Sequence, residues 1–115
     1  MKNDLLQLFV DSSDDFIYEI DINTNEIFWY KDISKQLNFP NKTNFSNVEQ
    51  LLKKITQKHK QKFLDKLSSK TNNTIHYEIK DYYGRYQIWE DKYIFQENKI
   101  IGVIKDISQI MICQP

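Results

Sequence analysis

The sequence contains few of the residues that cross-link a chain or build a phosphate-binding loop. Its 115 residues include one cysteine, two glycines and two prolines. Cys113 cannot pair within the chain, which fits a reducing compartment and a fold without disulfides. Gly84 and Gly102 stand too far apart for a glycine-rich phosphate loop, and the chain has no nucleophile elbow or CxxC motif. The sequence therefore lacks the common motifs of enzymes that bind nucleotides or that use a serine or cysteine nucleophile.

Net charge and long apolar runs are missing as well. Sixteen basic and sixteen acidic residues cancel, so the whole chain has no electrostatic attraction to nucleic acid or to an anionic membrane. No apolar run reaches the ~18 to 20 residues that a membrane helix needs, and no signal-peptide pattern is present. We therefore expect a cytoplasmic chain with no membrane segment and no nucleic-acid partner.

The chain is rich in aromatic residues, with seven tyrosines, seven phenylalanines and two tryptophans. A chain of this length forms one domain and buries roughly two-thirds of its unfolded surface. Most of the aromatics fall in segments that we predict to be strands, where some must pack beneath helices. Because large rings fill space, we expect a small internal pocket or none.

The last third of the sequence predicts three consecutive strands. Residues 75–81 alternate apolar and polar side chains, and residues 86–95 form a long aromatic and β-branched run. Gly84 allows a reversal between these segments because glycine tolerates a positive φ. The polar residues 96–98 form a second reversal before a strand at 99–107. Such a meander needs helices to cover its apolar face.

The preceding residues supply helices and one hairpin. A hairpin is predicted at 16–21 and 26–30, and a short helix at 31–37 ends before Pro40. Ser46 and Glu49 fit a capping box that opens a helix. A further helix follows Thr56, with Phe63, Leu64 and Leu67 expected to face inward. A short N-terminal helix carries an apolar stripe formed by Leu5, Leu6, Phe9 and Val10. The pattern predicts an α+β domain with one antiparallel sheet.

Several short motifs occur in a fixed order: DFIYEID at 15–21, IFW at 27–29, LNFP at 37–40, YEI at 77–79 followed by Gly84, and GVIKDIS at 102–108. Their order and spacing resemble those of the PAS sensory domain. This resemblance implies a five-stranded antiparallel sheet with the first strand beside the last, helices packed on one face, and an N-terminal flanking helix. It divides the chain into a flanking helix at 1–14, a PAS domain at 15–108 and the start of a linker at 109–115.

Three positions differ from the pattern of that family. Asn38 replaces a usual glycine, which is acceptable because asparagine also adopts left-handed conformations. Tyr83 replaces the aspartate of the usual turn. Trp89 follows Gly84 by five residues, where the family more often has four, so the register of this strand stays open between a bulge and a shift.

The resemblance implies a cytoplasmic sensor or regulatory domain that is not an enzyme by itself. Its output would be a diguanylate cyclase or a histidine kinase, and nothing in the sequence chooses between them. Two mechanisms stay open, a small-molecule sensor and a ligand-free interaction module. For a ligand, the inner sheet face and helices would supply Tyr18, Trp29, Ile33, Leu37, Phe63, Leu67, Tyr77, Ile79, Trp89 and Ile104.

Signal transfer would involve the end of the last strand, at Asp106, Ile107 and Ser108. A homodimer is expected through the N-terminal stripe of Leu5, Leu6, Phe9 and Val10, because a short helix cannot be stable alone. We expect no cofactor and no metal. A haem ligated by His59 is disfavoured by its lysine neighbours, and flavin photochemistry by the lack of any cysteine before Cys113.

The remaining charged residues are predicted to be surface groups. His76 falls on the polar face of its strand, and Glu90 and Asp91 have no partner with catalytic or metal-binding spacing. Seven lysines lie between Lys53 and Lys70, and we interpret them as the solvated face of two helices rather than as an anion-binding patch.

Overall fold

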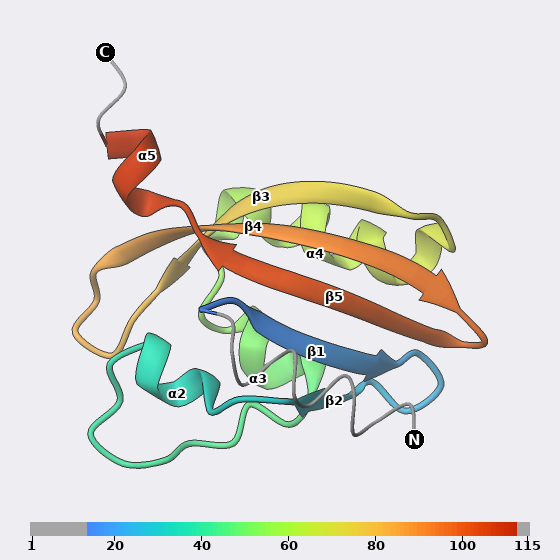
Figure 1. Cartoon of the computed structure of the whole chain (residues 1–115), viewed down its shortest axis with the longest axis horizontal. Coiled ribbons are helices and arrows are strands. Elements are labelled where there is room, and N and C mark those ends of the chain that lie inside the picture. Colours follow the sequence, from blue (N-terminus) through green and yellow to red (C-terminus); the bar gives the residue numbers. More distant parts are fainter. Residues whose placement is uncertain (1–13, 113–115) are drawn as a thin grey trace.

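The structure is a computed structural model that describes residues 14–112. The expected N-terminal helix and its stripe of Leu5, Leu6, Phe9 and Val10 lie outside these residues. The elements of the described chain are, in order, β1 (Phe16–Asp21), β2 (Glu26–Trp29), α2 (Ile33–Gln36), α3 (Val48–Leu52), α4 (Gln57–Ser69), β3 (Asn73–Lys80), β4 (Tyr86–Gln96), β5 (Lys99–Asp106) and α5 (Ser108–Ile112) (Figure 1).

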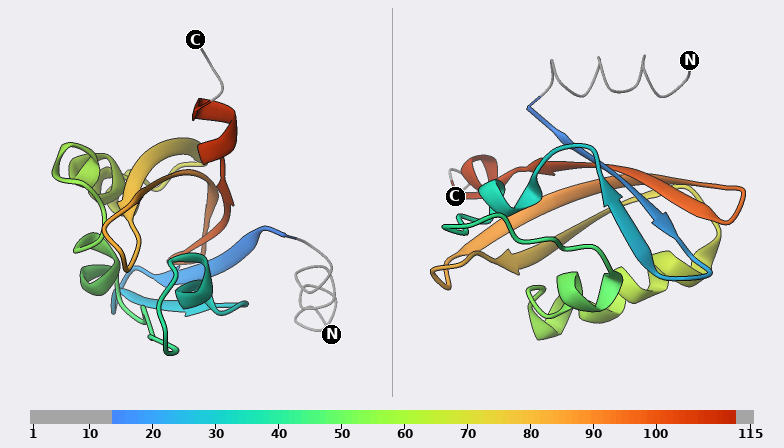
Figure 2. Two further views of the ribbon diagram at one scale, coloured as in Figure 1. Left: turned by 90° about the vertical axis from the view of Figure 1, so that its left-hand side faces the viewer. Right: turned by 90° about the horizontal axis from the view of Figure 1, so that it is seen from below.

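The strands form one antiparallel sheet in the order β2-β1-β5-β4-β3. The first strand is therefore central and pairs with the last, as the family resemblance implies. Figure 2 shows the sheet as a curved layer with α3 and α4 on one side. The core between these layers includes Ile20, Leu51, Ile55 and Phe63. The observed architecture confirms the predicted α+β class.

The register of β4 is regular, which settles the open position of Trp89. Tyr77 pairs with Trp89 and Lys80 pairs with Tyr86, with no interruption between them. Trp89 is fully buried, so the odd-numbered residues of β4 face the helices. The extra residue lies in the turn, where Gly84 has φ 81°.

Non-glycine residues with a left-handed backbone conformation occur in the turn between β4 and β5 and after α2. Glu97 and Asn98 have φ of 51° and 64°, which suits the two-residue turn between β4 and β5. Asn38 has φ 61°, as expected for the residue that replaces glycine.

Four local predictions need correction. The N-cap of α3 is Asn47 and not Ser46, because the Asn47 side chain accepts the Gln50 N–H at 2.9 Å. The helix predicted at 31–37 is shorter, since α2 has only four residues. On α4, Leu64 is exposed, whereas Phe63 and Lys66 are buried.

The fourth correction concerns His59, whose polar neighbours predict an exposed side chain. It is half-buried, and its Nδ1 accepts the Glu78 N–H at 2.9 Å. Burial and the nearby Lys62 lower the pKa of His59. His76 is exposed, as predicted.

Candidate functional site: a buried polar cluster and an edge pocket

A polar cluster of four side chains lies inside the domain, between the sheet and α4. The ammonium of Lys66 lies 2.8 Å from the Asp91 carboxylate, and both side chains are 0% exposed. Lys66 also donates to the Tyr18 hydroxyl at 2.9 Å. Tyr18 and Tyr77 in turn donate to the two carboxylate oxygens of Asp91 at 2.8 and 2.9 Å. Each charged group is therefore paired and hydrogen-bonded, which burial requires.

Tyr18 reaches this cluster because the residue beside it has no side chain. Tyr18 pairs with Gly102 across β1 and β5, while Asp91 lies one strand further on β4. A Cβ at Gly102 would lie 2.4 Å from the Tyr18 ring. The phenol therefore extends over the backbone of β5 to reach the carboxylate, and only glycine leaves it room.

Aromatic rings surround the ammonium of Lys66. Its Nζ lies 3.8 Å from the ring centroid of Phe63, 4.7 Å from that of Tyr18 and 5.7 Å from that of Tyr93. Such rings attract a cation through their negative faces, most strongly away from water. The rings and the carboxylate together replace the solvation that Lys66 loses.

Burial dominates the protonation behaviour of the cluster. It lowers the pKa of Lys66, while the charge of Asp91 acts in the opposite direction. Burial and the neighbouring Asp91 charge raise the pKa of both Tyr18 and Tyr77 well above 10.0. The two phenols consequently remain hydrogen-bond donors to Asp91 at neutral pH.

The interior around this cluster is filled. The gap bounded by Tyr18, Trp29, Phe63 and Tyr77 measures about 140 Å³ and is too narrow to admit a water molecule. The side chain of Lys66 closes part of it. This packing agrees with the expectation of a small pocket or none.

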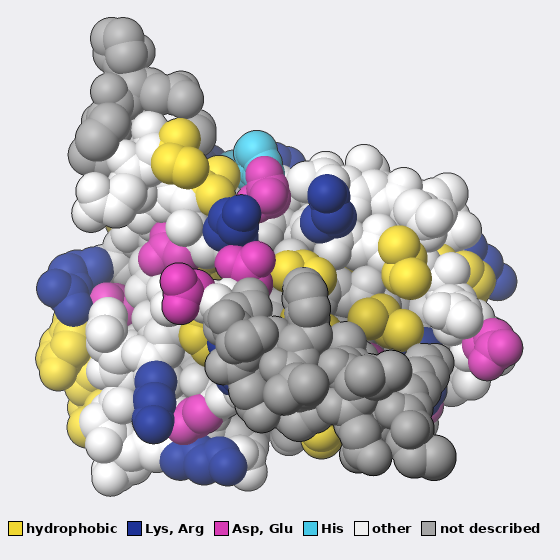
Figure 3. Space-filling model, viewed as in Figure 1, with side chains coloured by type: hydrophobic (Ala, Val, Ile, Leu, Met, Phe, Trp, Pro, Cys, Tyr) yellow, Lys and Arg dark blue, Asp and Glu magenta, His cyan; other side chains and the backbone are white. Residues whose placement is uncertain are grey.

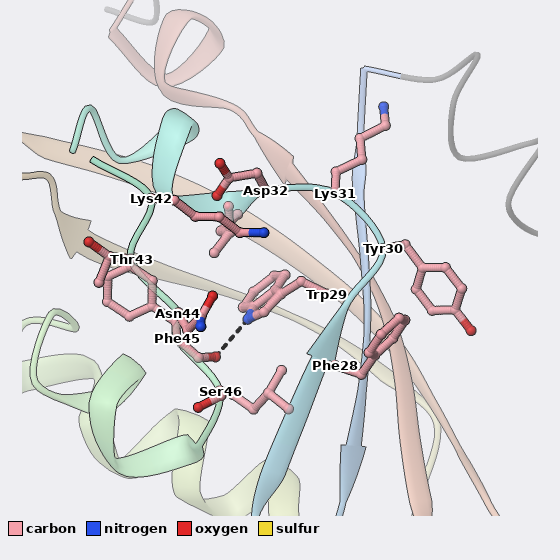
Figure 4. Close-up of a pocket in the computed structure, with 12 residues that line it drawn as sticks. Phe28, Trp29, Tyr30, Lys31, Asp32, Lys42, Thr43, Asn44, Phe45 and Ser46 are labelled. Atoms are coloured by element: carbon pink, nitrogen blue, oxygen red, sulfur yellow. Dashed lines mark hydrogen bonds between the residues drawn. The ribbon is translucent and has the colours of Figure 1, made fainter. Parts of the chain in front are cut away.

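A larger pocket lies on the outside, at the edge of β2 (Figure 4). It measures about 350 Å³ and runs between β2, the start of α2 and residues 42–46. Trp29 forms part of its wall and donates its Nε1–H to the Phe45 carbonyl at 2.8 Å. Ile27 donates its N–H to the Ser46 carbonyl at 2.7 Å. These two bonds hold the 42–46 segment beside the strand.

The end of β5 is fastened to two other elements. Asp106 accepts a hydrogen bond from Gln36 of α2 at 2.9 Å, and Gln36 also donates to Gln87 of β4. Ser108 accepts the Ile88 N–H at 2.9 Å, and the Ile107 N–H donates to the Ile88 carbonyl. From this junction α5 leads away from the body of the domain (Figure 1).

The structure brings the ten predicted ligand residues together in or against one core. Trp29 and Leu67 are half-buried, and the other eight are buried. Five of them, Tyr18, Trp29, Phe63, Tyr77 and Ile104, line the narrow interior gap. The predicted relay residues Asp106 and Ser108 contact their neighbours as described above, and Ile107 is buried.

Sequence reasoning missed the two charged members of the cluster. Asp91 and Lys66 are completely buried, so the prediction that they are surface charges is wrong. The signal was present in the spacing. Asp91 lies between Trp89 and Tyr93 on the inward-facing positions of β4, and Lys66 follows Phe63 by three residues on one helical face.

Residues 14–112 contain neither a metal-binding group of side chains nor a membrane-spanning helix. Within them, no three histidine, cysteine, aspartate or glutamate side chains are grouped so as to hold a metal ion. The helices of the same residues are all too short or too polar to cross a membrane.

Comparison with known proteins identifies the fold. No protein-family model and no curated protein matches this sequence. The N-terminal domain of a diguanylate cyclase with a PAS/PAC sensor from Marinobacter aquaeolei superposes with a TM-score of 0.72 at 18% identity, covering 84% of this chain and 98% of that one.

Two further solved structures agree. A sensory box histidine kinase/response regulator from Burkholderia thailandensis has a TM-score of 0.72 at 13% identity, covering 92% of this chain and 86% of that one. The PAS domain of an HTR-like protein from Haloarcula marismortui has a TM-score of 0.65 at 13% identity, covering 92% and 97%. With the strand order and helix placement described above, these matches show that the chain has the PAS fold.

Proposed function

We propose that this chain is a cytoplasmic sensory or regulatory domain of a signal-transduction protein, in which a change in the domain reaches an output domain joined after α5. The PAS fold, and the cyclase and kinase sensor proteins among its structural neighbours, support a signalling role. By analogy with those neighbours the output would be a diguanylate cyclase or a histidine kinase. In this proposal the domain itself catalyses no reaction.

The observation that carries this proposal is the junction at the end of β5. Asp106 contacts Gln36 of α2, and Ser108 contacts Ile88 of β4. A displacement of α2 or β4 would therefore reach the start of α5 through these hydrogen bonds. This arrangement suits a relay between the domain body and whatever follows it.

The filled interior supports a mechanism that needs no large internal ligand. The Lys66–Asp91 pair and its surrounding rings occupy the space between sheet and helices. Haem and flavin fit this chain poorly, because His59 lies in the first turn of α4 with its Nδ1 bonded to Glu78, and the interior gap is too narrow for either group. We propose that neither cofactor is used.

We also propose that the domain acts as a homodimer. On the outer face of the sheet, exposed Phe28 and Ile94 lie in one row with Ile101, with Glu19 between Phe28 and Ile101, and hydrophobic side chains are visible on this face (Figure 3). Exposed apolar surface of this kind marks an interface. The N-terminal residues Leu5, Leu6, Phe9 and Val10 would supply the partner surface.

Sedimentation tests the dimer. We expect wild type to dimerise at micromolar concentration and a Leu6→Glu, Phe9→Glu variant to be monomeric. A wild-type monomer at high micromolar concentration, or a dimer unaffected by both substitutions, would rule out this interface.

A reporter fusion tests the relay itself. A diguanylate cyclase or kinase output joined after Pro115 should change its activity when Asp106→Ala or Ser108→Ala breaks the junction. Lys105→Ala, at the exposed neighbouring position, is the matched control and should leave the output unchanged. If both junction variants behave like the control, the relay is not at this junction.

A further inference from the structure

The pocket at the edge of β2 has the features of a small-molecule site. Its volume of about 350 Å³ lies near the lower end of the range for such sites. Trp29, Ile33 and Phe45 give it apolar walls, and Phe45 and Ile33 are themselves buried. The Trp29 indole is held in place by its hydrogen bond to Phe45, so its ring is already oriented for stacking.

The charged groups of the pocket favour an anion. Its lining contains Lys31, Lys42 and one carboxylate, Asp32. Asp32 is already engaged, because its Oδ1 accepts the Ser34 N–H as the N-cap of α2. Lys42 is exposed, and Figure 4 shows its side chain extending along the pocket above Trp29. An acidic group placed here would meet the positive charge of Lys42, whereas Lys31 extends away from the pocket and its ammonium lies 5.9 Å from the Phe16 ring centroid (Figure 4).

The pocket and the buried cluster share a wall. Ile27 and Trp29 line both the outer pocket and the narrow interior gap. On the inner side, the Trp29 ring centroid lies 5.7 Å from that of Tyr18, which donates to Asp91. A molecule stacked on the outer side of Trp29 would therefore press on the same ring that borders the cluster.

We propose that the β2 edge pocket binds a small aromatic carboxylate, with its ring against Trp29 and its carboxylate near Lys42, and that Trp29 transmits occupancy to Tyr18 and the buried Lys66–Asp91 pair. Such a ligand enters from outside and leaves the filled core intact. In the proposed sensory function, this pocket is the site that receives the signal. Only that role rests on the proposed function, because ligand binding itself can be measured without it.

Two-dimensional NMR of the full 115-residue chain provides the test. The indole N–H of Trp29 gives a signal separate from that of buried Trp89. Phenylacetate, titrated to about 20 mM to detect millimolar binding, should shift the Trp29 signal saturably. Phenylacetamide, the neutral isostere, should bind about three- to fivefold more weakly, as expected for loss of an exposed charge contact.

Substitutions then locate the site. Lys42→Gln should weaken phenylacetate binding by a similar factor, whereas Lys92→Gln, an exposed lysine of β4 outside the pocket, should not change it. At saturation the backbone amides of Tyr18 and Asp91 should shift as well. That of Leu64, on the outer side of α4, should not.

Three results would overturn the proposal. The first is no saturable shift of the Trp29 indole at the highest phenylacetate concentration. The second is equal binding of phenylacetamide, or equal binding by the Lys42→Gln variant. The third is a shift of the cluster amides with the Trp29 indole unchanged, which would place the ligand in the core. None of these measurements uses an output domain, so their failure would leave the reporter-fusion result unaffected.

Discussion

At the scale of single residues, the most unusual feature is an ion pair in the middle of the core. Removing two charges from water costs several kcal/mol each in practice, and their attraction offsets this cost only when every remaining hydrogen-bonding site is filled. Here Tyr18 and Tyr77 fill the sites on Asp91, and aromatic rings surround Lys66. The pair therefore fixes the relative positions of α4, β1, β3 and β4.

Breaking the pair from one side should be costly. We expect Lys66→Met to lower the free energy of unfolding by ~3–5 kcal/mol, because it leaves Asp91 charged and unpaired in the core. Adding Asp91→Asn should recover much of this loss, because the neutral amide removes the unpaired charge and its oxygen still accepts from one of the two tyrosines. Lys62→Met, one turn earlier and exposed, should change stability by less than about 0.5 kcal/mol. Denaturant unfolding measures all three, and equal losses in Lys66→Met and Lys62→Met would contradict the buried pair.

The two buried phenols predict a loss of stability at high pH. Their pKa values are raised in the folded state above 10.0, so the folded chain retains protons that the unfolded chain releases. The stabilisation is therefore complete below pH ~10 and declines above it, by ~1.4 kcal/mol per pH unit for each phenol. The lowered pKa of Lys66 acts in the opposite sense, and only below its ordinary value of 10.5.

Denaturant unfolding between pH 9 and 12 would measure this slope. Tyr18→Phe and Tyr77→Phe should each make it shallower. Tyr83→Phe, at an exposed turn position, is the control and should leave the slope unchanged. A slope that none of the three variants alters would show that these phenols ionise equally in the folded and unfolded chain.

The aromatic members of this cluster could be predicted from the sequence, but its charged members could not be predicted with equal ease. Tyr18 and Tyr77 fall on apolar positions of alternating strands. Lys66 and Asp91 occupy sequence positions with the periodicity of buried residues, but both side chains are charged. Because charged side chains usually lie on the surface, their charge led to the prediction that they are exposed. Their burial becomes reasonable only when each is seen as the partner of the other, and that requires α4 and β4 to be placed in space.

At the scale of elements, the crossing of Tyr18 over β5 depends on one glycine. Gly102→Ala would place a Cβ 2.4 Å from the Tyr18 ring, which Asp91 and Lys66 hold in position. We expect this overpacking to cost ~1–3 kcal/mol in denaturant unfolding. It should also shift the NMR signals of Tyr18 and Asp91.

Gly84 offers a comparison of a different kind. A Cβ there meets nothing within 4 Å, but the residue has φ +81°. Gly84→Ala should therefore cost ~1–2 kcal/mol through backbone strain alone, with no change in the NMR signals of Tyr18.

The outcome for Gly102→Ala decides the packing of Tyr18. If this substitution left the free energy of unfolding unchanged, the close passage of the Tyr18 ring over β5 would be wrong.

The strands were easier to predict than the ends of the helices. Alternation and turn residues define β3, β4 and β5, because a one-residue shift would expose their apolar faces. At α3, two adjacent residues, Ser46 and Asn47, are both good caps. Asn47 is the N-cap because its side chain accepts the Gln50 backbone N–H at 2.9 Å. The Gln50 side chain in turn accepts the Ser46 backbone N–H at 2.9 Å. That choice depends on atomic contacts and not on residue type.

At the scale of the whole molecule, the filled interior leads to an expectation about cofactors. Protein purified from its native host should show neither a Soret band nor flavin absorbance near stoichiometry. His59→Ala should leave the spectrum unchanged. A stoichiometric chromophore, especially one lost in His59→Ala, would mean that the core opens far more than its packing suggests.

The same close packing has a mechanical consequence. Pressure unfolds proteins largely by eliminating internal voids, so the volume change of unfolding scales with the void volume. Phe63 is 0% exposed, and the gap beside it admits no water. Phe63→Ala should cost ~3–5 kcal/mol, and it should also increase the size of the volume change that high-pressure fluorescence measures. Hydrostatic pressure should therefore have little effect on the folding equilibrium of the native domain. The Phe63→Ala variant, with a void in place of the ring, should unfold at lower pressure.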